Sequence, residues 1–344
     1  MSLPQTTKHY YFPEVGDGSF DKLTLASSPL PHLQANEALV KIHAVSLQAR
    51  DLLIAKGLFP SMPNLIPCSD MAGEIVSVGD TVSEWKAGDR VCANFFLDYI
   101  DGYLRPELLG TLGASVQGVL AQYRVFPVHA LVRIPPHLSY VEASTLPCAA
   151  LTAYSALRGL EPVKAGDTVL IPGTGGVATF ALQFAVAMGA RAIVTSSSDA
   201  KLLQAAARGA MHVVNYRTMP AWDAEVLRLT NGVGVDHVLE IGGPESLARS
   251  MNSVRMCGNI AIIGASFRAK QTDFPDISIP SIMKGLKFRG IQIGSVELFR
   301  EMNVFISEHQ IRPVIDKVFR FEETKEAYGY LESQTHVGKI VIQI

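Results

Sequence analysis

A glycine-rich turn between a predicted strand and a predicted helix constrains the fold of this chain more than any other feature. Thr168–Ile171 is a short apolar run rich in β-branched residues, which indicates a buried parallel strand. Three glycines follow within Gly173–Val177, and apolar side chains then recur at helical spacing up to Met188. A second strand is predicted at Arg191–Thr195. The glycines therefore lie between a strand and a helix N-terminus, which is the setting of a dinucleotide-binding turn.

Glycine suits this turn because it has no side chain. We expect Gly173 to permit the tight turn, Gly175 to let phosphate oxygens approach backbone N–H groups, and Gly176 to let the helix pack closely on the strand. The predicted contacts to the pyrophosphate come from Gly173, Thr174, Gly175, Gly176 and Val177.

The end of the second strand predicts which dinucleotide binds. A protein that prefers NAD usually has Asp or Glu about twenty residues beyond the glycines, where the carboxylate accepts hydrogen bonds from the ribose. Ser196 holds this position here, although a shifted register would offer Asp199 instead. A hydroxyl can donate to a 2′-phosphate that a carboxylate would repel. The sequence therefore favours NADPH, with predicted contacts from Ser196, Ser197, Lys201 and Tyr216, and with Arg217 as a further donor.

The composition is typical of a globular enzyme with about two domains. The 344 residues are 48% hydrophobic and 18% charged, and the net charge of −2 gives no basic excess that would attract nucleic acid. The N-terminus lacks the apolar core of a signal peptide, and no apolar stretch approaches the ~18 residues of a membrane span. We therefore expect a cytoplasmic protein with no membrane or nucleic-acid partner. The cysteines are widely separated without a CxxC pair, which argues against disulfides and structural zinc: Cys68, Cys92, Cys148 and Cys257.

Two different patterns of predicted secondary structure along the chain indicate the domain organisation. Up to about Phe126 the sequence consists of strand and turn patterns, and beyond it strands alternate with helices. Such alternation implies a doubly wound parallel sheet. A last helix and the strand within His336–Ile342 are expected to return to the first domain. We predict an α/β fold with a β-rich domain of residues 1–125 and 296–344 and a Rossmann domain of residues 126–295.

Several motifs, in order along the chain, resemble the medium-chain dehydrogenase/reductase superfamily over essentially the full length. They are Gly73–Gly79 (GEIVSVG), Lys86–Val91 (KAGDRV), Thr145–Tyr154 (TLPCAALTAY), the glycine turn, and His336–Lys339 (HVGK). The resemblance is greatest to the zinc-free, quinone-oxidoreductase-like branch. It implies a GroES-like catalytic domain that closes over a nicotinamide held by the Rossmann domain. It also implies a homodimer formed through the strands near Asn259–Gly264 and Gly285–Gly294.

The resemblance identifies the positions where zinc-containing members bind their catalytic metal. Those members use Cys, His and Cys, and the matching positions here are Gln48, Ser69 and Cys148. A catalytic zinc normally has three protein ligands, so one cysteine cannot hold it. We therefore expect no metal and interpret Cys148 as a packed thiol.

Without zinc, hydrogen bonds must stabilise the negative charge that develops when hydride arrives. Hydride addition to an enone or quinone spreads this charge into an enolate, which a few donors can stabilise. Gln48 is expected to donate to the substrate oxygen, and Asp51 to order its loop. Tyr99 or Tyr103 could supply the proton, unless their loop only packs its aromatic side chains on the barrel. The tyrosines usual in quinone reductases are replaced by Leu53 and Phe59, so the proton donor stays open.

The resemblance implies further cofactor contacts, from Thr152, Gly242, Ile263, Gly264, Gly294, Ser295 and Lys339. We predict an NADPH-dependent, zinc-independent oxidoreductase that reduces the C=C bond of a small α,β-unsaturated carbonyl compound or a quinone. Two alternatives stay open: a zinc-free alcohol dehydrogenase or carbonyl reductase, and a nucleotide-binding sensor without catalysis.

Overall fold

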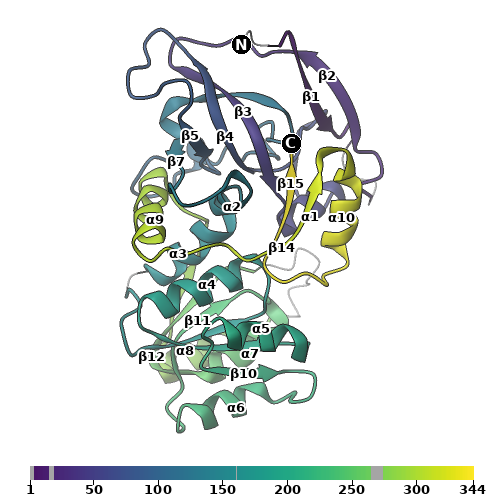
Figure 1. Cartoon of the computed structure of the whole chain (residues 1–344). Coiled ribbons are helices and arrows are strands. Elements are labelled where there is room, and N and C mark those ends of the chain that lie inside the picture. Colours follow the sequence, from purple (N-terminus) through teal and green to yellow (C-terminus); the bar gives the residue numbers. More distant parts are fainter. Residues whose placement is uncertain (1–3, 15–18, 160, 265–273) are drawn as a thin grey trace. The chain divides into compact units, whose positions relative to one another are not determined.

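The chain folds into two compact units in this computed structural model, which describes residues 4–14, 19–159, 161–264 and 274–344 (Figure 1). Unit 1 comprises residues 1–151 and 294–344, and unit 2 comprises residues 152–293. The predicted boundary between residues 125 and 126 is therefore too early. One short strand, Tyr123–Pro127, spans it and pairs with Glu37–Ser46, and a second, Leu131–Arg133, lies beyond it and pairs with Arg90–Ala93, both within unit 1.

Unit 1 is built on a sheet that brings both ends of the chain together. The strand order is β14-β15-β3-β4-β5-β7, with β6 paired to β3. The C-terminal β15 pairs with β3, so the last segment returns to the first domain as predicted. The strands are β1 (Thr6–Tyr11), β2 (Thr24–Pro29), β3 (Glu37–Ser46), β4 (Asp70–Val78), β5 (Arg90–Ala93), β6 (Tyr123–Pro127), β7 (Leu131–Arg133), β14 (Ile315–Arg320) and β15 (Lys339–Gln343). The helices are α1 (Ala49–Ala55), α2 (Tyr140–Ala143), α9 (Val296–Glu308) and α10 (Thr324–Glu332).

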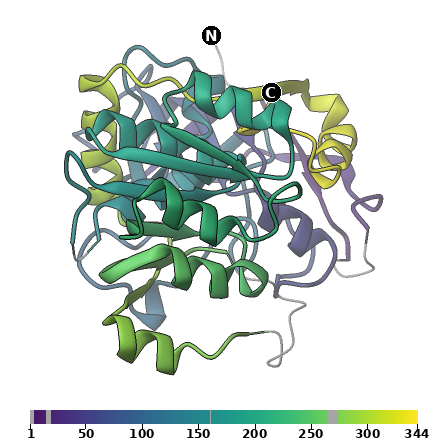
Figure 2. The ribbon, with the colours of Figure 1, turned by 90° about the horizontal axis from the view of Figure 1, so that it is seen from below.

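Unit 2 is a parallel sheet with helices on both faces (Figure 2), as the alternating sequence pattern predicts. The strands are β8 (Thr168–Pro172), β9 (Arg191–Ser196), β10 (His212–Asn215), β11 (Val235–Glu240), β12 (Val254–Ile262) and β13 (Lys287–Gly290). The helices are α4 (Gly176–Ala187), α5 (Asp199–Ala207), α6 (Trp222–Leu229), α7 (Pro244–Ser253) and α8 (Ser278–Lys284), while α3 (Leu151–Leu157) begins at the boundary. No described helix combines the length and the hydropathy that a transmembrane span requires.

The strand order of unit 2 determines where a ligand can bind. The order is β10-β9-β8-β11-β12-β13, so the chain leaves β8 toward β9 and later returns to the other side of β8 as β11. All five residues of β8 are buried, which explains its unbroken apolar run. Parallel sheets bind ligands in the crevice at the carboxyl ends of the strands where the order reverses. Here that point lies between β8 and β11.

Candidate functional site

The glycine turn leaves the carboxyl end of β8 open. Gly173 has φ +110°, and its N–H donates to the Thr195 carbonyl over 2.8 Å. Gly175 is the N-cap of α4, and no side chain caps that helix end. A Cβ atom added to either Gly173 or Gly175 would have no neighbour within 4 Å. A phosphate group would fill such a space beside a helix N-terminus, so the turn fits the pyrophosphate of a dinucleotide.

The carboxyl end of β9 carries the residues for which the sequence predicts a contact with the ribose phosphate. Ser196 is the last residue of β9 and lies opposite Asn215 of β10. The Tyr216 N–H donates to the Ser196 carbonyl over 3.1 Å, so these two predicted residues are adjacent. Asp199 is the first residue of α5, and its carboxylate accepts a 2.6 Å hydrogen bond from Asn215 Nδ2. Ser196 therefore holds the strand-end position, while Asp199 is paired with Asn215.

The loops that follow β11 and β12 lie against each other at the same edge. The N–H groups of Ile263 and Gly264 donate to the Glu240 carbonyl over 2.9 and 3.0 Å. A Cβ atom added to Gly264 would lie 1.8 Å from the Ile241 carbonyl oxygen. Gly264 is thus explained by close packing of the two loops. The expected passage of Ile263 and Gly264 beneath a ribose stays a prediction.

Three predicted cofactor residues belong to unit 1 and have local partners there. An added Cβ at Gly294 would crowd side-chain atoms of Leu151 and Leu298, and Ser295 Oγ accepts a 3.1 Å hydrogen bond from the Leu298 N–H as the N-cap of α9. Lys339 Nζ donates to the Leu47 carbonyl, and the residue is 3% exposed. The ammonium of Lys339 is thus engaged within unit 1, and its expected approach to a phosphate stays a prediction. Thr152, in unit 2, is buried.

A buried polar cluster in unit 1 surrounds the Asp70 carboxylate. Gln48 Nε2 donates to Asp70 Oδ2 over 2.5 Å, and Ser69 Oγ donates to Asp70 Oδ1 over 2.6 Å. The Cys148 N–H donates to Asp70 Oδ2 over 3.0 Å. The sequence analysis missed Asp70, although it directly follows Ser69 at the start of β4. We call Gln48, Asp51, Ser69, Asp70, Cys148 and Lys339 the polar cluster.

Burial shifts the pKa values of the ionisable groups in the polar cluster toward the neutral forms, and neighbouring charges and hydrogen bonds oppose these shifts. Burial raises the pKa of Asp70, whereas the Lys339 ammonium and the hydrogen bond from Ser69 lower it. Burial also raises the pKa of Asp51 to about 6, against the effects of Arg50 and the Gln48 N–H. That N–H donates to Asp51 Oδ2 over 2.7 Å, so Asp51 orders the start of α1 as predicted. Burial lowers the pKa of Lys339, and Asp70 opposes this effect.

These residues do not fit a catalytic zinc. In the part of the chain that the structure describes, no three or more His, Cys, Asp or Glu side chains form a group that could hold a metal ion. The Gln48 amide and the Ser69 hydroxyl both act as donors toward Asp70. Cys148 is then the one remaining residue of a zinc-ligand type at the three positions, and a catalytic zinc normally has three protein ligands.

Neither predicted tyrosine has the geometry of a buried proton donor. The Tyr99 hydroxyl donates to the Gly102 carbonyl over 2.8 Å, and the Tyr99 carbonyl accepts from the Val296 N–H over 2.9 Å. Tyr103 is 93% exposed. The structure thus brings Gln48 and Asp51 together and leaves Tyr103 facing solvent.

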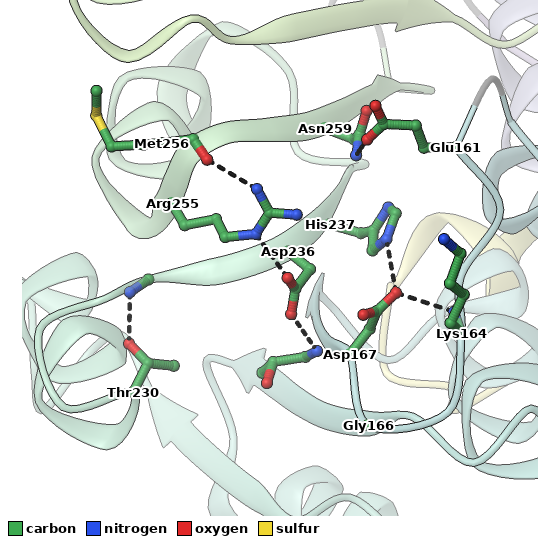
Figure 3. A network of polar contacts seen from close by, with 12 residues as sticks. Glu161, Lys164, Gly166, Asp167, Thr230, Asp236, His237, Arg255, Met256 and Asn259 are labelled. Carbon is green, nitrogen blue, oxygen red and sulfur yellow. Dashed lines mark hydrogen bonds and ion pairs between the residues drawn. The ribbon is translucent and has the colours of Figure 1, made fainter.

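A second polar network lies at the opposite, amino-terminal edge of the unit 2 sheet (Figure 3). Asp236 accepts hydrogen bonds from the Thr168 N–H over 2.7 Å and from Arg255 Nε over 2.6 Å. Asp167 is paired with His237 Nε2 at 3.2 Å. These contacts connect the first residues of β8, β11 and β12, and sequence reasoning did not find them.

Comparison with known proteins identifies both units. The family model of the alcohol dehydrogenase GroES-like domain matches residues 34–136, and that of the zinc-binding dehydrogenases matches residues 176–308. A zinc-type alcohol dehydrogenase-like protein of Schizosaccharomyces pombe is 46% identical over 336 residues, which are 94% of this chain and 96% of the relative.

Solved structures agree over the whole length. A structure assigned as an alcohol dehydrogenase of Sinorhizobium meliloti is 36% identical, with a TM-score of 0.93 and full coverage of both chains. An NAD-dependent alcohol dehydrogenase is 30% identical, with a TM-score of 0.88, covering 98% of this chain and 99% of that one. The quinone oxidoreductase of Coxiella burnetii shares the fold at 24% identity, with a TM-score of 0.79, covering 98% of this chain and 99% of that one. The chain therefore belongs to the medium-chain dehydrogenase/reductase superfamily, a family of nicotinamide-dependent oxidoreductases.

Proposed function

We propose that this protein is an NADPH-dependent, zinc-independent reductase of the C=C bond in α,β-unsaturated carbonyl compounds or quinones. The observation that carries the proposal is the polar cluster, in which hydrogen-bond donors occupy the zinc-ligand positions of the family. The bound nicotinamide would supply the hydride. The residues of this chain would bind and orient the substrate.

Gln48 is the residue we propose to contact the substrate oxygen. Its amide nitrogen carries two N–H groups, and Asp70 accepts from one of them. The second N–H remains to donate to a carbonyl oxygen, while Asp70 fixes the orientation of the amide. A single neutral donor is better suited to stabilise the delocalised charge of an enolate than the localised charge of an alkoxide. This difference favours reduction of a conjugated C=C bond.

The proposed preference for NADPH depends on the carboxyl end of β9. Ser196 holds the strand-end position, and Asp199 is already hydrogen-bonded to Asn215. Lys201, in the first turn of α5, would add a positive charge near a 2′-phosphate. The alternative is a preference for NADH, because one similar solved structure is that of an NAD-dependent alcohol dehydrogenase. Binding constants for both nucleotides, measured by fluorescence titration, decide between them.

A zinc-free carbonyl reductase is the second candidate, because the relatives at 46% and 36% identity carry names of the alcohol dehydrogenase type. Steady-state rates with matched enones, quinones and saturated ketones separate the two. We expect the conjugated substrates to react faster. Faster turnover of the saturated ketones would favour the second candidate.

Gln48→Leu tests the proposed contact to the substrate, since leucine removes the donor at similar volume. We expect kcat for an enone to fall about tenfold, less than the 10²–10³ of a sole oxyanion donor, because water or backbone groups share the charge. NADPH affinity should not change. Gln343→Leu, at an exposed position of β15, is the matched control. A Gln48→Leu protein with wild-type kcat would show that Gln48 only replaces a lost ligand.

We also propose a cytoplasmic homodimer formed through unit 2. Strands β10 and β13 are the two edges of its described sheet, and α8, which precedes β13 in the chain, exposes Ile279, Ile282 and Met283 by 60%, 77% and 70%. An unpaired edge next to apolar side chains favours association with a second copy. Light scattering should give twice the chain mass of 37.2 kDa. A mass of one chain across micromolar concentrations would contradict the dimer.

A further inference from the structure

The carboxyl end of β11 contains a buried carboxylate that the proposed function has not used. Glu240 is the last residue of this strand and is 1% exposed. Its Oε1 accepts from the N–H groups of Gly242 and Gly243 over 2.8 and 2.9 Å, and from Ser246 Oγ over 2.5 Å. Its Oε2 accepts from Ser250 Oγ. All four partners are donors of the loop and helix that follow β11.

Glu240 also connects two loops through its backbone. Its carbonyl accepts from the N–H groups of Ile263 and Gly264, which follow β12. Gly243 has φ +90° and ψ −152°, a conformation that is essentially restricted to glycine. A Cβ atom added to Gly242 would lie 2.3 Å from Ser246 Oγ. These contacts hold the 241–243 loop in one shape.

The position of Glu240 relates this loop to the glycine turn. Val238 lies opposite Leu170 in the parallel register of β11 and β8. Two residues further along each strand, Glu240 is level with Pro172, directly before Gly173. The loop therefore borders the crevice at the point where the strand order reverses.

We propose that Glu240 is a positioning residue for the dinucleotide. Its carboxylate fixes the 241–243 loop as a wall of the crevice next to the glycine turn, and the nucleotide binds against that wall. Glu240 acts through the loop and does not contact the cofactor. The inference rests on the proposed function, because it assumes that this crevice binds NADPH.

Glu240→Gln is the principal test, because it keeps the volume and converts one acceptor atom into a donor that faces other donors. We expect the Kd for NADPH to rise about tenfold, while kcat at saturating NADPH stays within twofold of the wild type. Hydrogen exchange of the Gly242 and Gly243 amides should accelerate. A purely structural role would leave the Kd of the folded variant unchanged.

Asp236→Asn is the matched control, since it alters a carboxylate at the other end of the same strand. We expect it to leave the Kd for NADPH unchanged. Ser246→Ala is a second, milder variant that removes one donor to Glu240, and it keeps the test decisive if Glu240→Gln does not fold. For Ser246→Ala we expect about a threefold rise in the Kd.

The outcomes separate this inference from the function on which it rests. A wild-type protein that binds no NADPH would overturn the proposed function, and the role of Glu240 with it. A wild-type protein that binds NADPH, together with folded Glu240→Gln or Ser246→Ala variants of equal affinity, would overturn the role of Glu240 alone. A fall in kcat with an unchanged Kd would also contradict it.

Discussion

The two edges of the unit 2 sheet use the same strands for different purposes. At the carboxyl edge, open glycine backbone and the loop held by Glu240 border the place where we propose that the dinucleotide binds. At the amino edge, Asp236 and Asp167 are paired with Arg255 and His237, and these pairs connect the strands (Figure 3). At the carboxyl edge the buried Glu240 carboxylate fixes the shape of a loop, because its partners are donors of that loop and of the helix after it. At the amino edge the partly buried Asp236 and Asp167 carboxylates join strands, because their partners include side chains of neighbouring strands. Substitutions at the carboxyl edge should therefore change nucleotide binding, and substitutions at the amino edge should change the free energy of unfolding.

The largest effect is expected from Gly175→Ala at the carboxyl edge. Its φ of −78° suits alanine, and the added methyl group meets no atom of the described residues within 4 Å, so folding should be unaffected. The methyl group would occupy the space of a phosphate oxygen, and we expect about 100-fold weaker NADPH binding, ~2.7 kcal/mol. Calorimetric titration measures the affinity, and thermal unfolding of the free protein provides the control. Unchanged affinity would remove the glycine turn from the binding site.

Ser196→Asp should have the next largest effect, also on binding alone. The new carboxylate would lie at the end of β9, where we propose that the 2′-phosphate binds. Repulsion of about 2 kcal/mol corresponds to roughly 30-fold weaker NADPH binding. NADH has no such phosphate, so its affinity should not fall. Equal losses for both nucleotides would contradict the assignment of Ser196 to the phosphate.

Asp236→Asn tests the amino edge and should change stability without changing binding. The variant loses the ion pair with Arg255, and we expect the free energy of unfolding to fall by about 1–3 kcal/mol. Burial opposes ionisation of Asp236, but the hydrogen bonds from Arg255 and Thr168 outweigh it and lower its pKa. Its stabilisation is therefore present above the unfolded-state pKa and is lost as the pH falls through the folded-state value.

Urea unfolding of the wild type and Asp236→Asn at neutral and acid pH checks both statements. The difference between the two proteins should be largest near pH 7 and should shrink toward pH 3. A difference that grows on acidification would show that the Asp236 pKa is raised. A change in NADPH affinity would contradict the separation of the two edges.

The parts that sequence predicted well are those with local signals. The strand, glycines and helix from Thr168 to Ala187 lie next to one another in the chain, so apolar periodicity locates them within a residue or two. The domain boundary failed because β6 and β7 are short and pair with β3 and β5, which no local pattern reveals. Asp70 and its partner Gln48 are 22 residues apart, and Lys339 is 292 residues from Leu47. Only the fold brings such residues into one cluster.

We propose that this family member reduces conjugated double bonds without zinc. The most direct measurement is NADPH-dependent reduction of an enone by protein dialysed against a chelator, with the metal content determined on the same sample. We expect full activity in a sample that contains far less than one zinc ion per chain. Activity that disappears on dialysis and returns with stoichiometric zinc would contradict it.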